Sequence, residues 1–414
     1  MKIKTYIYAI SAVCSTLFLG GCIANYSNVI ENPKSISQIF SKEGLKQQVI
    51  DYVAHPEQLI ADIQNFKANF DKVVSFLNLN ASKEWGQKNT QLPSQEVYVK
   101  YTDSYLSRAR VDFNKGLISV ETLDTENPKE SLKKAIVTTL LTPEDPEKVD
   151  LFTDKEVKLK GEPYLQDLVK DNEGKVIKNA TQANRFAEYL IANKLQITEI
   201  KEKNIKKQMH YVEVPMSANH QAKSQNKYGG FVSFYSKAYK LEEALIFAII
   251  KTESAFNPYA VSYVPAYGLM QIVPTSAGRD VYKALNNQDG IPTKEMLFVP
   301  KTNIQYGSTY LNILFTRYIK GVNNSLSHEY CVIAAYNTGS GNVLNVFDKD
   351  RTKAVQVINS MTSAEVYRKL RTSLKYEEAR NYLHKVTNAK KEFQTQSKAQ
   401  AESQINSNAH LSLK

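Results

Sequence analysis

A strongly apolar stretch at residues 241–250 constrains the fold more than any other part of the sequence. It runs into the polar residues 251–254 and stops at Asn257-Pro258, because proline cannot continue a helix. A run of this length and apolarity predicts a buried helix. Glu253 therefore falls on the last turn of a helix whose other side chains are removed from water.

Helical periodicity continues through most of the chain after His220, with breaks at Pro258, Pro274, 290–292 and Pro300. The clearest helical segments are residues 228–239, 242–253, 303–320, 329–339 and 376–392. We predict a compact all-α domain over residues 206–392. The residues after it, 393–414, are rich in Gln, Ser, Ala and Asn, and this composition predicts a disordered tail.

The first half of the chain combines helical and strand patterns. Residues 43–53, 56–79, 129–141 and 182–193 have helical spacing, whereas 97–101, 105–113, 117–123 and 209–214 alternate as strands do. Asn114-Lys115-Gly116 predicts a hairpin turn. We predict an α+β domain over residues 41–205, and an α+β fold class for the chain as a whole. This half contains no phosphate-binding loop, metal-ligand spacing or nucleophile motif.

The first 21 residues have the pattern of a secretory signal peptide. Lys2 and Lys4 precede an apolar run at residues 6–19, and small residues follow it. A membrane-spanning helix needs about 20 apolar residues, which is more than this run supplies. A short buried helix or a tail anchor is the alternative interpretation.

Leu19-Gly20-Gly21-Cys22 resembles a bacterial lipobox, in which the cysteine thiol is acylated. The resemblance implies a lipid anchor on Cys22, followed by a tether at residues 22–40 that is rich in Asn and Ser. By resemblance to lipoproteins of double-membraned bacteria, Ile23 in place of Asp favours the outer membrane, with the protein facing the periplasm. Cys331 would then be the only free thiol, so we expect no disulfide.

The positive charge of the chain is concentrated in the helical domain. The sequence has 53 Lys and Arg against 42 Asp and Glu, a net charge of +11. Residues 23–205 hold 25 basic and 27 acidic residues, whereas residues 206–392 hold 24 and 14. A basic domain favours a polyanionic partner such as nucleic acid, anionic lipid or cell wall. A secretory signal and the lack of a recognition motif argue against nucleic acid.

Glu253 has the position that a general acid needs. Apolar neighbours and the negative end of the helix dipole both raise the pKa of a carboxyl group at the end of a buried helix. A carboxyl that stays protonated near neutral pH can protonate a departing glycosidic oxygen. A solvated glutamate at a helix end is the alternative, and position alone does not exclude it.

Four motifs follow one another in the order and spacing of one enzyme superfamily. They are residues 253–258 (ESAFNP), 260–262 (AVS), 268–272 (GLMQI) and 335–339 (AYNTG). Asn303, Gly307 and the pairs 310–311 and 381–382 fit the remaining helices. Together these residues resemble the goose-type lysozyme and lytic transglycosylase superfamily. The flanking sequence resembles a lipoprotein subgroup in which an α+β domain precedes a lysozyme-like catalytic domain.

The resemblance implies a site and a substrate. Glu253 matches the single catalytic acid/base of the superfamily, which acts on peptidoglycan glycan strands. Residues at positions that contact the sugar chain are Ser262, Met270, Gln271, Tyr310, Tyr336, Asn337, Glu378 and Tyr382. For each of these side chains, plain packing is the alternative interpretation.

A single carboxylate requires a nucleophile from elsewhere, because most glycosidases use two carboxylates. The resemblance implies that the N-acetyl group of muramic acid takes this role. Deprotonated Glu253 then accepts a proton from the C6 hydroxyl, which attacks C1 and leaves a 1,6-anhydromuramoyl end. An intramolecular attack of this kind gains from a high effective molarity.

A protein of another class could carry the same sequence features. A non-catalytic peptidoglycan-binding scaffold lipoprotein would use its sugar-binding groove only to hold glycan. Such a protein has no need of an acidic side chain in apolar surroundings. A metal enzyme is not indicated, because the six histidines show no ligand spacing and HExxH is absent. We expect no cofactor and no metal. The domain at residues 41–205 could bind a protein partner, position the catalytic domain or shape the groove.

Overall fold

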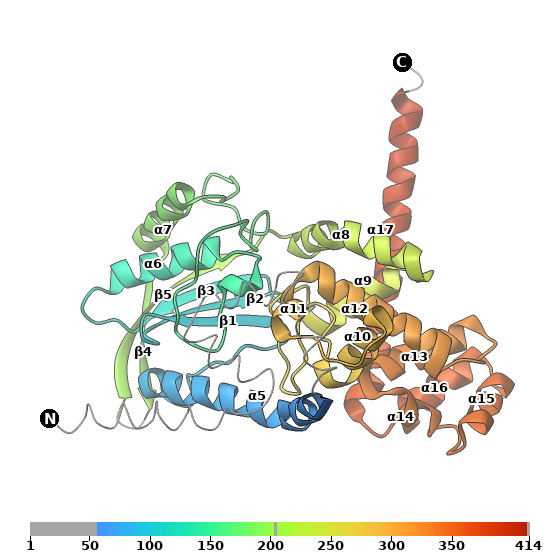
Figure 1. Cartoon of the computed structure of the whole chain (residues 1–414). Helices are drawn as coiled ribbons and strands as arrows, with labels where there is room; N and C mark the ends of the chain where they lie inside the picture. Colours follow the sequence, from blue (N-terminus) through green and yellow to red (C-terminus); the bar gives the residue numbers. More distant parts are fainter. Residues whose placement is uncertain (1–55, 203–204, 412–414) are drawn as a thin grey trace. The chain divides into compact units, whose positions relative to one another are not determined.

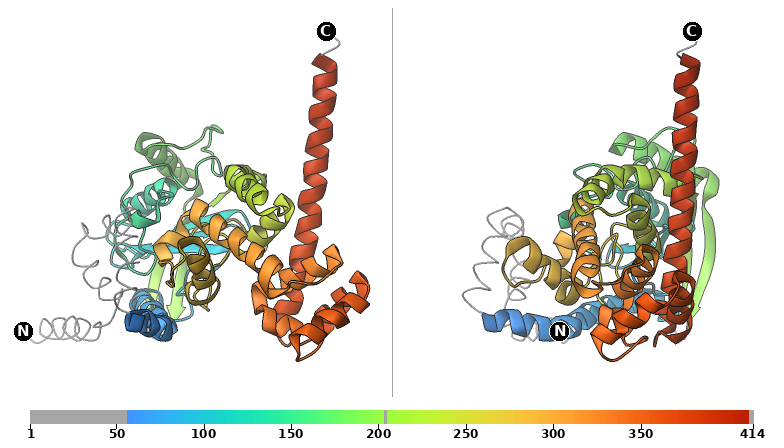
Figure 2. Two further views of the ribbon diagram at one scale, coloured as in Figure 1. Left: turned by 45° about the vertical axis from the view of Figure 1, so that its right-hand side comes forward. Right: turned by 90° about the vertical axis from the view of Figure 1, so that its right-hand side faces the viewer.

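The computed structural model describes residues 56–202 and 205–411, which form two compact units (Figures 1 and 2). Of the described residues, the sheet unit contains 56–202 and 205–218 together with Tyr259–Tyr267 and Ile272–Val299. The helical unit contains Asn219–Pro258, Gly268–Gln271 and residues 300–411. The predicted signal peptide, the predicted acylation site Cys22, the predicted tether and the predicted helix at residues 43–53 lie outside the described residues.

The sheet unit is built on one antiparallel sheet with the strand order β1-β2-β3-β5-β4 (Figure 1). The predicted hairpin turn at residues 114–116 is present, and Gly116 has the positive φ of +66° that favours glycine there. The strands are β1 (Val97–Thr102), β2 (Ser107–Asp112), β3 (Leu117–Thr122), β4 (Gln196–Glu202) and β5 (Ile205–Pro215).

Helices α6 and α7 pack against each other and against this sheet. Asn179 caps α7 by accepting a hydrogen bond from the backbone N–H of Gln182, and the apolar side chains of α6 and α7 are buried. The elements of this part are α5 (Pro56–Trp85), α6 (Pro128–Leu141), the short helix η2 (Pro146–Lys148) and α7 (Ala180–Lys194).

The helical unit surrounds α9 (Glu243–Ser254), the buried helix that the sequence predicts. Packing against α8 and α17 covers its apolar side chains, among them Phe247, which contacts Phe256 and Phe393. The other elements are α8 (His220–Tyr239), α12 (Pro300–Ile313), η4 (Leu314–Tyr318), α13 (Ser325–Thr338), α14 (Ser340–Leu344), α15 (Arg351–Ser360), α16 (Ser363–Ser373) and α17 (Glu377–Leu411). Cys331 is a buried free thiol in α13, and burial raises its pKa to about 12.

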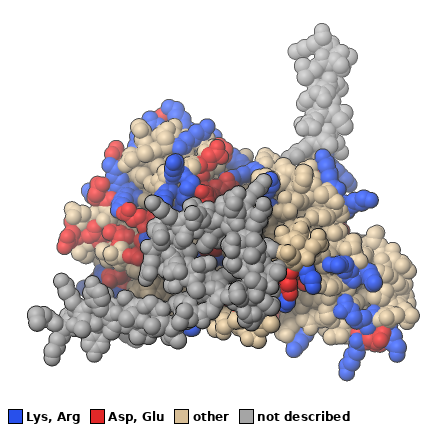
Figure 3. All heavy atoms as spheres, viewed as in Figure 1, with Lys and Arg blue, Asp and Glu red and all other residues tan. Residues whose placement is uncertain are grey.

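Basic side chains gather on the helical unit. Figure 3 shows lysines and arginines with few acidic groups over α14–α16, whereas both signs are interspersed over the sheet unit. This distribution agrees with the uneven charge of the two halves of the sequence. The exposed basic residues of this surface include Lys349, Arg351, Lys353, Arg368 and Lys375.

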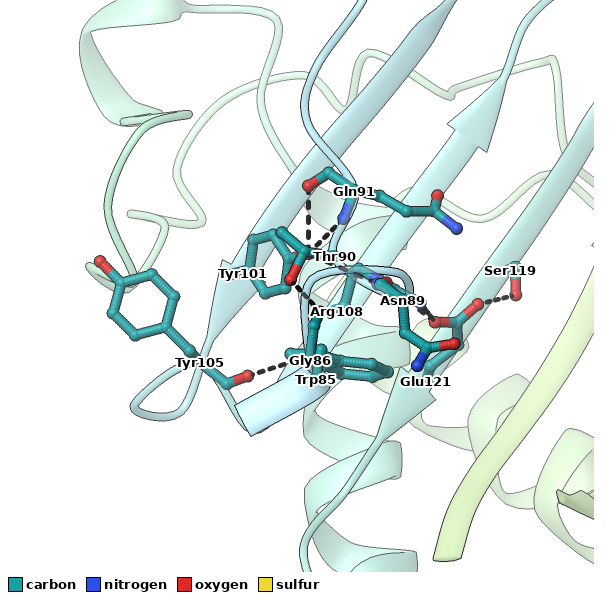
Figure 4. A network of polar contacts seen from close by, with 10 residues as sticks. All are labelled: Trp85, Gly86, Asn89, Thr90, Gln91, Tyr101, Tyr105, Arg108, Ser119 and Glu121. Carbon is teal, nitrogen blue, oxygen red and sulfur yellow. Dashed lines mark hydrogen bonds and ion pairs between the residues drawn. The ribbon is translucent and has the colours of Figure 1, made fainter. Parts of the chain in front are cut away.

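A buried ion pair holds the end of α5 against the sheet (Figure 4). The Arg108 guanidinium donates to the Glu121 carboxylate and to the backbone oxygen of Asn89, and it stacks over Trp85 at 3.9 Å. The Trp85 indole N–H donates to the backbone oxygen of Tyr105 at 2.7 Å. Because a buried charge is costly unless it is paired, this network favours a single placement of the loop after α5.

Two boundaries differ from the sequence predictions. The predicted domain boundary at 205/206 is wrong, because β5 begins at Ile205 and pairs with both β3 and β4. The predicted disordered tail is also wrong over most of its length, because α17 continues to Leu411 and extends beyond the other helices of its unit (Figure 2). Phe393 is buried, and the helix-forming residues that follow it allow the helix to continue.

Part of the expected all-α domain belongs to the sheet unit, and no pattern in the sequence indicates this. Residues Tyr259–Tyr267 and Ile272–Val299 pack there, including η3 (Pro274–Gly278), α10 (Arg279–Asn286) and α11 (Lys294–Phe298). The Tyr259 hydroxyl, for example, donates to the backbone oxygen of Pro143 at 2.7 Å. In the described part of the chain, no helix has the length and apolarity required to cross a membrane.

Candidate active site

The last turn of α9 places Glu253 among buried side chains of the helical unit. The helix ends at Ala255, whose left-handed backbone lets its N–H donate to the Lys251 carbonyl at 3.0 Å. The Glu253 side chain is 7% exposed, although a carboxylate is seldom buried without a partner. The structure therefore places this residue in the apolar surroundings that the sequence predicts.

Burial raises the pKa of Glu253 to about 8. Loss of hydration is the largest cause, because it disfavours the charged form. A polar interaction with the Tyr382 hydroxyl opposes the shift, and the negative charge of Glu378 adds to it. Glu253 is therefore a protonated, neutral acid at neutral pH.

Three tyrosines accompany this carboxyl group. Burial, and then the charge of Glu253, raise the pKa values of Tyr336 and Tyr382 well above their ordinary range, so both phenols remain neutral donors. The rings of Tyr310 and Tyr336 meet edge to face, with their centroids 5.6 Å apart. Helices α12, α13 and α17 supply these three side chains.

The turn Gly268–Gln271 is fixed to the helical unit by three hydrogen bonds. The Tyr336 hydroxyl donates to the Met270 carbonyl at 2.8 Å, and the Met270 N–H donates to Asn303 Oδ1 at 2.7 Å. Ser254 Oγ donates to the Leu269 carbonyl at 2.8 Å. The turn is thus attached to Ser254, the neighbour of Glu253, and to Tyr336.

The side chains of this turn are themselves buried. Met270 is completely buried and packs against Gly307, where even a Cβ atom would collide with its thioether. Gln271 is 7% exposed, and its side-chain amide donates to the Gly268 carbonyl at 2.9 Å. In this structure Met270 packs in the core, which is the alternative that the sequence left open.

The remaining predicted residues have different settings. Glu378 is exposed in the first turn of α17, and Asn337 is half-buried near the end of α13. Ser262 belongs to the sheet unit, where its hydroxyl donates to the Val264 carbonyl and accepts from the Ala266 N–H at 3.2 Å. Its contact with the sugar chain stays a prediction.

Two polar residues that support the site received no role from the sequence. Ser254 and Asn303 are completely buried, and both bind the backbone of the Gly268–Gln271 turn. A buried polar side chain needs a hydrogen-bond partner, and here the backbone of the turn supplies it. In the sequence, each of these residues is a polar side chain on an otherwise apolar helix face. This pattern could have indicated a buried polar residue, but it does not reveal which group the side chain binds.

The chain matches two family models. Residues 61–227 match the model described as "Membrane-bound lytic murein transglycosylase C, N-terminal domain", and residues 231–359 match the "Transglycosylase SLT domain". A protein called membrane-bound lytic murein transglycosylase C from Klebsiella pneumoniae is 40% identical over 325 residues, covering 78% of this chain and 89% of that protein. This chain belongs to the membrane-bound lytic murein transglycosylase C family.

A second relative agrees with this membership. The protein of the same name from Yersinia pestis is 41% identical over 315 residues, covering 76% of this chain and 87% of that protein. Among solved structures, the 70 kDa soluble lytic transglycosylase of Escherichia coli is 26% identical with a TM-score of 0.30. That match covers 39% of this chain and only 23% of the soluble enzyme.

The raised pKa of Glu253 predicts a pH-dependent stability. Between the unfolded pKa of about 4.5 and the folded value of about 8, the folded state holds one proton more than the unfolded state. Stability from this group is therefore lost as the pH rises, by about 3 kcal/mol at pH 7. We expect Glu253→Gln to gain stability relative to the wild type when the pH is raised from 5 to 8.

Urea unfolding of both proteins at the two pH values measures this change. Glu377→Gln, at an exposed position in α17, is the matched control and should show no pH-dependent difference from the wild type. A stability difference between Glu253→Gln and the wild type that is the same at pH 5 and pH 8 would contradict the assignment.

Proposed function

We propose that this chain is a lytic transglycosylase that cleaves the β-1,4 bond between N-acetylmuramic acid and N-acetylglucosamine in peptidoglycan, with Glu253 as the single general acid/base. The observation that carries the proposal is a carboxyl group kept neutral by burial beside two neutral tyrosines. Membership of the lytic murein transglycosylase C family supports the same reaction and substrate. A scaffold that only binds glycan is not favoured, because it gains nothing from a buried acid.

In the first step, protonated Glu253 donates its proton to the glycosidic oxygen as the bond to C1 breaks. A pKa of about 8 keeps the acid form populated at neutral pH and still permits release of the proton. The N-acetyl group of the same muramic acid stabilises the cationic centre as an oxazolinium species. The Glu253 carboxylate that results is stabilised by the Tyr382 hydroxyl.

In the second step, the Glu253 carboxylate accepts the proton of the C6 hydroxyl. The C6 oxygen attacks C1 at the same time and opens the oxazolinium ring. The product is a 1,6-anhydromuramoyl end, Glu253 is protonated again, and no water is consumed. Two other carboxylates of the domain are engaged in ion pairs, since Glu329 accepts from Lys390 and Asp289 accepts from Arg279. Their pairing supports a mechanism in which neither of them acts as a second catalytic carboxylate.

The remaining candidates bind and shape the substrate in this proposal. Tyr310, Tyr336 and Tyr382 offer aromatic faces and hydroxyl groups to the sugars, and Asn337 offers an amide. Ser262 and Gln271 remain predicted sugar contacts, Met270 supports the turn from the core, and Glu378 helps to raise the pKa of Glu253. The exposed basic surface of the helical unit attracts the anionic, peptide-bearing wall.

The proposed location is the outer membrane, with the protein held by a lipid on Cys22 and facing the periplasm. The lipobox at Leu19-Gly20-Gly21-Cys22 supports this, and the family name supports membrane association. The N-terminal domain, which includes β5 and so extends past the predicted end at residue 205, remains a candidate for binding a protein partner. We propose no cofactor and no nucleic-acid partner.

The products of peptidoglycan digestion test the reaction. We expect the wild-type protein to release muropeptides with 1,6-anhydromuramoyl ends from purified sacculi, as measured by mass spectrometry. Loss of a general acid costs roughly 10²–10⁴-fold in rate, so Glu253→Gln should lose activity by at least that factor. Reducing ends alone would indicate a hydrolase, and an unchanged rate in Glu253→Gln would remove this residue from the mechanism.

The dependence of activity on pH tests the environment of Glu253. Because the first step needs the protonated acid, the rate should fall as the pH rises through about 8. Glu378→Gln removes the negative charge that raises this pKa, so its alkaline limb should move to lower pH. Glu377→Gln alters the neighbouring charge, which does not act on Glu253, and should keep the wild-type profile. Equal shifts in both variants would contradict the assignment.

Replacement of the predicted acylation site tests the location. Cys22→Ser removes the thiol, so we expect the protein to leave the membrane fraction and to appear in the soluble periplasmic fraction. Separation of inner and outer membranes on a density gradient locates the wild-type protein. Retention of Cys22→Ser in membranes would contradict the lipid anchor.

A further inference from the structure

The turn Gly268–Gln271 has an unusual place in the chain. These four residues belong to the helical unit, whereas the residues directly before and after them belong to the sheet unit. The chain thus leaves the sheet unit at Tyr267 and returns to it at Ile272. Gly268 is bonded directly to Tyr267, and Gln271 is bonded directly to Ile272. Contacts that hold Tyr267 and Ile272 in place therefore also hold the two ends of the turn.

Tyr267 and Ile272 form a closed base for this turn. The Tyr267 N–H donates to the Ile272 carbonyl at 3.1 Å, and the Ile272 N–H donates to the Tyr267 carbonyl at 3.1 Å. Tyr267 also pairs with Val261 on its other side. Both ends of the turn are therefore held in one small antiparallel arrangement.

Aromatic packing from α5 holds this base. The Tyr267 ring is 3% exposed and lies 6.5 Å from the ring of Phe66 and 6.2 Å from that of Phe70, measured between centroids. Phe66 and Phe70 are one helical turn apart, so they present a continuous aromatic face. Phe298 of α11 contacts Tyr267 at 5.5 Å. The Tyr267 ring thus has aromatic contacts from two separate helices.

At the other end, the turn is part of the active site. Its Met270 carbonyl accepts the hydrogen bond of the Tyr336 hydroxyl, and the charge of Glu253 acts on Tyr336. Gln271 has a positive φ of +49°, a conformation that a non-glycine residue holds only where its surroundings enforce it. A loose base would relax this residue and release the Met270 carbonyl.

We propose that Tyr267 is a positioning residue for the reaction, because its ring, packed on Phe66 and Phe70, fixes the base of the turn whose Met270 carbonyl orients Tyr336. This inference rests on the proposed function and gives the N-terminal domain a role in it. Helix α5 of that domain acts on the reaction through the backbone of the turn, without a direct contact with the sugar. Small displacements of positioning groups are costly, because about 1 Å can reduce a rate 10²-fold.

Three substitutions test the role of the Tyr267 ring. Tyr267→Ala should lower kcat by about 10²-fold with KM little changed, whereas Tyr267→Phe keeps the ring and should retain activity. Phe113→Ala is the matched control, because Phe113 is equally buried in the sheet unit but packs on Tyr164 instead of the turn. All variants are compared below their unfolding midpoints. A loss in Tyr267→Ala no larger than that in Phe113→Ala would overturn the proposal.

A double-mutant cycle with Tyr336→Phe tests the route. If Tyr267 acts through the bond between Tyr336 and Met270, the loss caused by Tyr267→Ala should be smaller when Tyr336→Phe is already present. Additive losses would overturn this route. The measurement separates positioning from a general loss of stability, which would be independent of Tyr336.

Hydrogen exchange supplies a readout that does not depend on catalysis. The backbone N–H of Met270 is bonded to Asn303, so the peptide that contains it should exchange faster in Tyr267→Ala and unchanged in Phe113→Ala. Equal protection in Tyr267→Ala and the wild type overturns the positioning role, even if the wild-type protein releases no anhydromuropeptides. The absence of those products would overturn the proposed function alone.

Discussion

The burial of the Glu253 carboxyl group away from water is the constraint on which the rest of the helical unit depends. A solvated glutamate would be ionised at neutral pH and could not act as an acid. The apolar length of α9 and its cover by α8 and α17 keep this group protonated, and the nearby charge of Glu378 adds to the effect. The protein accepts a cost in stability for this arrangement, which is common where a buried group serves chemistry.

Local features of the fold could be predicted from the sequence, because they depend on periodicity and on residues that stop an element. The helix before Pro258, the position of Glu253 within it and the hairpin at Gly116 are of this kind. Long-range features could not be predicted in this way. The pairing of β5 with β3 and the burial of Met270 against Gly307 depend on segments that lie far apart in the chain.

The wrong prediction of a disordered tail at residues 393–414 has a different origin. The average composition of residues 393–414 is polar and predicted disorder, but a single buried ring at Phe393 attaches the start of this segment to Phe247 and Phe256. The burial of one large aromatic side chain outweighs the composition of its neighbours, since an aromatic ring removes a large apolar area from water. Helix propensity then allows α17 to continue.

The interleaving of the two units also determines where this chain can be divided. A cut after Ala218 would leave Tyr259 and Tyr267 in the second piece, without the Pro143 carbonyl and the Phe70 ring that they contact in the first. These side chains would then form an exposed apolar surface, which favours aggregation. The transglycosylase half is therefore not a self-contained module, and exchange of modules between relatives must keep both halves together as one folding unit.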